Sequence, residues 1–232
     1  MTEMTDEEIK AISAPTPASD NKGLRRAAHI VSDVFSPMLV PTIGMIIAMM
    51  LTGLVVLPLS TRLGSTLGIF FITCLLPMLL IFVLIKLGRV SDTSISNPDE
   101  RTLPFVGTTL CYIGAALYVY TLHAPIWLML FFLGAALVTA VCMLITHWWK
   151  ISAHTSGLGG LTGAIIWMAW RGLFVVNSMA VVTIAIVLLG CMASARLILG
   201  HHTLGQTAAG ALLGASIEFG LLALLGTPAL NS

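Results

Sequence analysis

The chain has 232 residues, of which 57% are hydrophobic and only 9% are charged. Soluble domains carry about 25% charged residues, so this composition excludes a soluble globular domain and indicates an integral membrane protein. The formal net charge of +1 provides no long-range attraction toward nucleic acid, and no nucleic-acid partner is expected.

Residues 1–36 form a polar tail, and the transmembrane domain is expected to occupy residues 37–232. Acidic side chains and two prolines predict disorder in Thr2–Lys22. Leu24–Phe35 combines Arg25 and Arg26 with apolar side chains. This pattern predicts an amphipathic helix that lies in the membrane interface rather than crossing it.

The rest of the chain contains apolar segments close to the ~20 residues that a helix needs to cross a bilayer, the fifth only if it starts near Lys150. In chain order these segments are Met38–Leu57, Leu67–Leu87, Phe105–Leu122, Pro125–Thr146, Ser156–Trp170, Met179–Ala195 and Leu204–Leu225. Backbone polar groups must be satisfied inside lipid, so the segments predict helices. The expected fold is all-α: a polytopic membrane bundle of about six to seven transmembrane helices.

Polar residues are concentrated in the segments between these spans. Because successive spans cross the membrane in opposite directions, the number of spans predicts on which membrane face each polar segment lies. With Arg62 in the turn after the first span, the second, fourth and sixth spans end on the same membrane face, here called face A. Face A then receives Gly88–Pro104, Lys150–His154 and Arg196–Gln206. Charged clusters that converge from different helices predict a functional site on that face.

These clusters resemble the motifs of the type 2 phosphatidic acid phosphatase superfamily of integral membrane lipid phosphatases. Its second motif, Pro-Ser-Gly-His, corresponds to Ile151-Ser152-Ala153-His154 here. Its third motif, Ser-Arg followed by His and Asp at fixed spacing, corresponds to Arg196, His202 and Gln206. The first motif is the least similar, because Arg101-Thr102-Leu103-Pro104 follows Ser94 where the family has Lys.

The resemblance implies a phosphatase or diphosphatase that hydrolyses a lipid phosphate through a phosphohistidine intermediate. His202 would attack phosphorus, and His154 would protonate the leaving oxygen and then activate water. Guanidinium groups suit phosphate oxygens because they bind them bidentately. The expected phosphate-binding residues are Arg101, Arg196, Ser152 and Lys150.

Gln206 departs from the family, since an amide cannot stabilise an imidazolium as the usual Asp does. A His-Thr-x-x-Gln ending is similar to the polyprenyl diphosphatase branch, of the dolichyl type, so Gln206 is assigned a supporting role. The substrate then stays open between a polyprenyl diphosphate and a glycerolipid phosphate. The alternative function is a non-catalytic membrane protein of the same fold that binds or transports a lipid phosphate.

The expected partners are the lipid substrate and membrane lipids, with a homo-oligomer left open. No metal or other cofactor is expected, because no cluster has ligand spacing. Positive charge is concentrated on face A, which predicts a cytoplasmic site, whereas the family resemblance implies a periplasmic or lumenal one. Glu218 is placed toward the opposite face, away from the site, with a structural role. Gly157–Gly163 and Gly210–Gly214 are expected to serve close helix packing.

Overall fold

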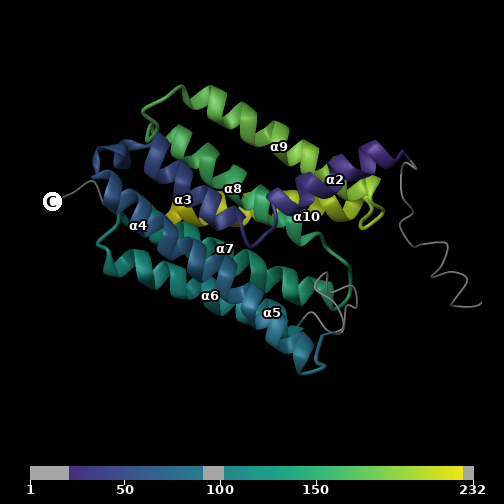
Figure 1. The fold of residues 1–232 in the computed structure, drawn as a ribbon. Helices are drawn as coiled ribbons and strands as arrows, with labels where there is room; N and C mark the ends of the chain where they lie inside the picture. Colours follow the sequence, from purple (N-terminus) through teal and green to yellow (C-terminus); the bar gives the residue numbers. More distant parts are fainter. Residues whose placement is uncertain (1–20, 91–101, 227–232) are drawn as a thin grey trace, which may run out of the picture.

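The computed structural model describes residues 21–90 and 102–226, and every regular element in these two ranges is a helix. The helices form one bundle (Figure 1). Their bounds are α2 Lys22–Val34, α3 Val40–Leu51, η1 Gly53–Val56, α4 Leu59–Phe70, η2 Phe71–Leu75, α5 Leu76–Lys86, α6 Thr102–Thr121, α7 Ile126–Thr146, α8 Ala153–Trp170, α9 Ser178–Ile198 and α10 Leu204–Leu225.

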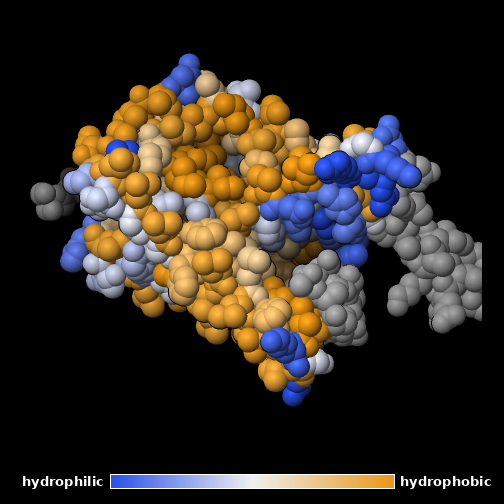
Figure 2. Space-filling model, viewed as in Figure 1, coloured by the Kyte–Doolittle hydropathy of each residue, from blue (hydrophilic) through white to orange (hydrophobic). Residues whose placement is uncertain are grey.

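Within the described ranges, five helical stretches are long and apolar enough to cross a membrane. They are Leu59–Lys86, Thr102–Thr121, Ile126–Thr146, Ser178–Ile198 and Leu204–Leu225. Apolar side chains cover most of the visible flank of the bundle, and hydrophilic ones gather over α2 at one end (Figure 2). The structure therefore confirms an all-α bundle compatible with a multi-pass membrane protein.

The helix in the first predicted span is shorter than the sequence predicts. Instead of one helix over Met38–Leu57, α3 ends at Leu51 after 12 residues, and η1 follows as a short 3-10 turn. The chain leaves the helix because it pairs with the loop before α9: Val175 N–H donates to the Leu51 carbonyl at 3.0 Å. An isolated antiparallel bridge joins Thr52 to Phe174.

The second span begins earlier than predicted and is not uniformly α-helical. Arg62, predicted in a turn, lies in the first turn of α4 and donates from Nε to the Leu57 carbonyl at 3.1 Å. The π-helical turn η2 interrupts the span just before Pro77. Because proline lacks an N–H and its ring crowds the carbonyl four residues earlier, a wider turn at this point relieves that conflict.

The centre of the bundle is α8, which packs against α10, α9, α7 and α3. It is buried along most of its 18 residues. The seam between α8 and α10 is lined by glycine, as the sequence predicts. A Cβ added at Gly214 would collide with the Ser156 carbonyl, and one added at Gly159 would collide with Ala211. The two backbones are therefore in direct contact.

The amphipathic helix predicted before the membrane domain is present as α2. Asn21 caps it by accepting from the N–H groups of Gly23 and Leu24 at 2.9 and 3.2 Å. The helix packs against α9, with Ala28 buried beside Ala195 and Leu199. This contact holds α2 over the end of the bundle where the polar clusters meet.

Candidate functional site

A cavity of about 460 Å³ opens at the α2 end of the bundle. Residues from α2, α3, α5, α6, α7, α8, α9 and α10 and from the loops before α3, α8 and α10 line it. Its polar part contains His154 at the start of α8, Arg196 near the end of α9, and His201 and His202 in the connecting loop. The structure thus brings together polar residues from two separate sequence clusters.

Arg196 is buried and is held from two sides. Its Nη2 donates to Nδ1 of His201 at 3.0 Å, and its Nη1 donates to the Ser32 hydroxyl on α2 at 3.4 Å. Because a guanidinium can only donate, Nδ1 of His201 acts as the acceptor and its proton resides on Nε2. α2 therefore contributes directly to positioning the arginine.

His202 has the opposite tautomer. Its Nδ1 lies 3.3 Å from the backbone carbonyl of Lys150, which can only accept a hydrogen bond. The proton is accordingly on Nδ1, and the lone pair of the neutral ring is on Nε2. The loop before α8 thus selects the tautomer of a histidine that precedes α10.

Both histidines are held in the neutral form. Burial, followed by the positive charges of Arg196 and Lys150, lowers the pKa of His202 to about 3, although the hydrogen bonds that His202 makes with the Lys150 carbonyl and the Gln206 side chain oppose this shift. The same two causes lower the pKa of His201 to about 4, with smaller contributions from His29 and Arg25 on α2. An imidazole that is neutral near pH 7 can act as a nucleophile or a base.

A glycine turn places these two histidines. α9 ends in a left-handed residue, Gly200, with φ +68°. The N–H of His201 donates to the Arg196 carbonyl at 3.1 Å, which closes the helix end. This arrangement is typical of a glycine-terminated helix and requires a residue without a Cβ. It reverses the chain so that His201 and His202 follow Arg196 into the same cavity.

Two helix N-termini meet at the site. Ser152 caps α8 by accepting from the Thr155 N–H at 3.4 Å. Thr203 caps α10, and Gln206 completes a capping box by accepting from the Thr203 N–H at 3.0 Å. Helix N-termini carry partial positive charge and favour anions. Together with Arg196, they make this end of the cavity suited to a phosphate group.

The remaining predicted site residues differ in position. Ser152 is fully buried beneath the cavity lining, where its side chain caps a helix. Lys150 contributes its backbone carbonyl, and its charge lies close enough to act on both histidines. The side chain of Gln206 is hydrogen-bonded to His202 and to the Thr203 N–H. Arg101 and Ser94 lie outside the described residues.

Several lining residues, among them His201 and Glu218, were not assigned to the site from the sequence. His201 adjoins His202, and only the turn at Gly200 shows that both rings reach the cavity. Glu218 was placed near the far face, but it lines the same cavity as His154 and Arg196 and is 1% exposed. An acidic residue within a membrane span was the available signal. Asp33 of α2 also lines the cavity.

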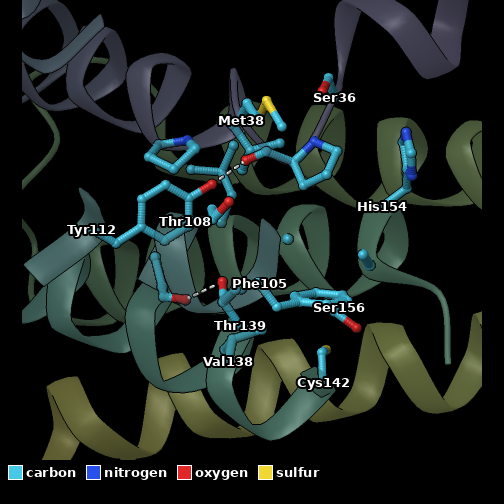
Figure 3. A pocket seen from close by; sticks show the side chains of 18 of the residues that line it. Ser36, Met38, Phe105, Thr108, Tyr112, Val138, Thr139, Cys142, His154 and Ser156 are labelled. Atoms are coloured by element: carbon cyan, nitrogen blue, oxygen red, sulfur yellow. Dashed lines mark hydrogen bonds between the residues drawn. The ribbon is translucent and has the colours of Figure 1, made fainter. Parts of the chain in front are cut away.

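The rest of the cavity wall is largely apolar. It also contains several hydroxyl groups, and these already donate hydrogen bonds to backbone carbonyls. Tyr112 donates to the Pro37 carbonyl at 2.7 Å, and Thr139 donates to the Ala135 carbonyl at 2.8 Å. Figure 3 shows these residues on the opposite side of the cavity from His154. Phe105 and Val138 also line the cavity. The cavity therefore combines a cationic, histidine-rich end with a predominantly apolar interior.

No group of three or more His, Cys, Asp or Glu residues in the described ranges is arranged to hold a metal ion. Comparisons with family models, curated proteins and solved structures found no match for the chain.

Proposed function

We propose that the protein is a membrane lipid phosphatase that hydrolyses a lipid phosphate or diphosphate. The observation that carries this proposal is that Arg196, which is hydrogen-bonded to His201, lines the same end of a largely apolar cavity as His202, whose tautomer is fixed by the Lys150 carbonyl. A phosphate needs cationic donors and a nucleophile, whereas the lipid chain needs an apolar space. The resemblance to type 2 phosphatidic acid phosphatases belongs to the same proposal.

In the first step, the Nε2 lone pair of His202 attacks phosphorus and forms a phosphohistidine. The bond between phosphorus and the lipid oxygen breaks, and His154 gives its proton to that oxygen. Burial, followed by the charge of Arg196, lowers the pKa of His154 to about 3, so His154 acquires this proton only when a negatively charged phosphate is bound beside it. Arg196 and the N-terminal N–H groups of α8 and α10 stabilise the charge on the phosphoryl oxygens.

In the second step, His154 removes a proton from water, which attacks the phosphohistidine and releases phosphate. This step restores His202 with its lone pair on Nε2 and leaves His154 protonated. Neither step needs a further reactant. Arg101 and Lys150 are proposed additional phosphate contacts, and Gln206 is proposed to orient His202.

A binding or transport protein is the second candidate function. The amide at Gln206 favours it, because it cannot stabilise an imidazolium by charge. Such a protein would use the same cavity and the same cations without turning over the lipid. The two candidates therefore differ in phosphate release but not in lipid binding.

The deciding experiment measures phosphate release from purified protein in detergent, given polyprenyl diphosphate, polyprenyl phosphate, phosphatidate and lysophosphatidate. The wild type should release phosphate from at least one lipid, and His202→Ala should release none while unfolding at the same temperature. His29→Ala, which removes a histidine at the cavity mouth, serves as the control and should retain activity. Lipid binding without release in the wild type would support the second candidate.

A further inference from the structure

Glu218 sits in the cavity wall in a space that two glycines leave for it. A Cβ added at Gly134 of α7 would collide with its carboxyl oxygens, and one added at Gly160 of α8 would lie 3.9 Å from its Cβ. Three helices thus surround the carboxyl group. The residue is 1% exposed, and its Oε1 has no hydrogen-bond partner among the described residues.

A buried carboxyl oxygen without a partner is costly, since it loses its bonds to water and gains none in return. Hydroxyl groups elsewhere in the cavity wall already donate to other acceptors. Thr108, Thr139 and Ser156 each donate to a backbone carbonyl in their own helix or at its cap, at 2.8, 2.8 and 2.9 Å. A partner for Oε1 of Glu218 must therefore enter through the cavity, either as water or as a group of a bound ligand that displaces it.

The depth of Glu218 below His154 can be read along α8. Gly160, which adjoins Glu218, comes six residues after His154. At 1.5 Å per residue, the two levels are about 9 Å apart. A group that meets Glu218 while the phosphate meets His154 must span this distance.

The backbone of an acylated lipid phosphate has that reach. From phosphorus to the ester carbonyl oxygen of a glycerol phosphate there are about six covalent bonds, or roughly 7 Å when extended. A hydrogen bond of about 2.8 Å brings the total to about 10 Å. A plain hydrocarbon or polyprenyl chain carries no acceptor oxygen at this depth.

We propose that Glu218 forms a second polar subsite, which donates a hydrogen bond to a carbonyl or hydroxyl oxygen on the backbone of the bound lipid phosphate. A neutral carboxyl group is much cheaper to bury than a carboxylate, and it has the proton that such an acceptor needs. This inference rests on the proposed function for the identity of the phosphate end. It assigns Glu218 a role in selecting the lipid.

The matched probes are lysophosphatidate with a palmitoyl chain and hexadecyl phosphate, which has a chain of the same length but no backbone oxygen. Binding is measured by native mass spectrometry, so the test does not depend on turnover. The wild type should bind lysophosphatidate about tenfold more tightly than hexadecyl phosphate, as expected for one buried hydrogen bond. Glu218→Leu should reduce this ratio to about 1, whereas Glu218→Gln, which can still donate, should retain part of it.

Ser216→Ala is the control, because Ser216 is a polar residue on the same helix that is exposed on the outside of the bundle. It should leave the ratio unchanged. A ratio that stays near ten in Glu218→Leu would overturn the subsite. If phosphate release fails but the binding ratio behaves as expected, the catalytic proposal is wrong and the subsite stands.

Carbodiimide labelling covers the case in which Glu218→Leu does not fold. Carbodiimides modify neutral carboxyl groups in apolar surroundings, and mass spectrometry locates the adduct. Glu218 of the wild type should be labelled, and lysophosphatidate should slow the labelling about tenfold more than hexadecyl phosphate at equal occupancy. Equal protection by both lipids would overturn the proposal.

Discussion

Nδ1 of His202 lies 3.3 Å from the carbonyl oxygen of Lys150, 52 residues earlier in the chain. This bond joins the loop before α8 to the loop before α10, and it determines which ring nitrogen carries the lone pair. Lys150 thus acts on the proposed nucleophile through its backbone. Substitution of its side chain should leave the tautomer unchanged while removing a nearby positive charge.

The role of His154 as a general acid can be tested by varying the leaving group. His154→Ala should reduce turnover of an alkyl phosphate by about 100-fold or more, the usual contribution of a positioned acid. An aryl phosphate leaves without needing a proton, so its turnover should fall by less than about tenfold. Steady-state kinetics with both substrates would measure the difference. Equal losses for the two would contradict an acid role.

The amide side chain of Gln206 completes the capping box of α10. Gln206→Asp should lower activity about tenfold, because the shorter side chain cannot complete the capping box and the new acid would pair with Arg196 in place of substrate. Gln206→Glu is the matched control for length and should keep the cap. Phosphate release and the unfolding temperature would be measured for both. A clear rate gain in Gln206→Asp would show that the site favours a carboxylate.

The seam between α8 and α10 should not tolerate an added methyl group. Gly214→Ala should destabilise the protein by about 1–3 kcal/mol, because its Cβ would meet the Ser156 carbonyl. Gly220→Ala provides the comparison, since a Cβ there meets nothing within 4 Å on the same helix. Thermal unfolding in detergent should show a lower midpoint for the first variant only. A similar midpoint for the two would mean that the helices separate easily.

Stability should depend on pH through the buried histidines. The pKa of His202 is about 3 and that of His201 about 4 in the folded protein, against an ordinary value of 6.5. Between pH 6.5 and 4 the unfolded chain binds protons that the folded chain does not, so stability should rise with pH across this window and level off above it. Unfolding midpoints from pH 4 to 8 would show the slope. The slope should be smaller in His202→Gln; an unchanged slope would exclude His202 as a source.

The orientation of the site is proposed from charge, which places face A in the cytoplasm. In a background lacking the native thiols, Trp148→Cys would place a thiol at a residue that is 82% exposed beside the site end of the bundle. It should resist an impermeant maleimide in intact cells and react after lysis. Val56→Cys, at the opposite end and 85% exposed, should react in intact cells. The reverse pattern would place the site outside.

Much of the helical fold follows from the sequence, because long apolar segments have few alternatives in lipid. The glycines at the α8–α10 seam are equally predictable, since small residues allow backbones to approach. The end of α3 is not, because it depends on pairing with Phe174, far away in the chain.

The position of Glu218 could not be predicted for a related reason. Counting along α10 gives its height in the bundle but not the depth to which the cavity extends. The hydrogen bond between Arg196 and His201 depends on the turn at Gly200, whose geometry is set by three-dimensional packing. Residue spacing identified the clusters, whereas the presence of both neighbouring histidines in one cavity depends on the turn that follows α9.

The direct contact of α8 and α10 has a consequence for how the site meets its ligand. No side chains separate the two backbones at this seam, so sliding or rotating one helix against the other would make backbone atoms collide. His154 and His202 stand at the N-terminal ends of this pair, so their separation is set when the bundle folds and not when a lipid arrives. The conformational entropy of the two histidine rings is therefore lost when the protein folds. A phosphate then binds to a site that is already assembled, and its affinity is not reduced by the ordering of these rings.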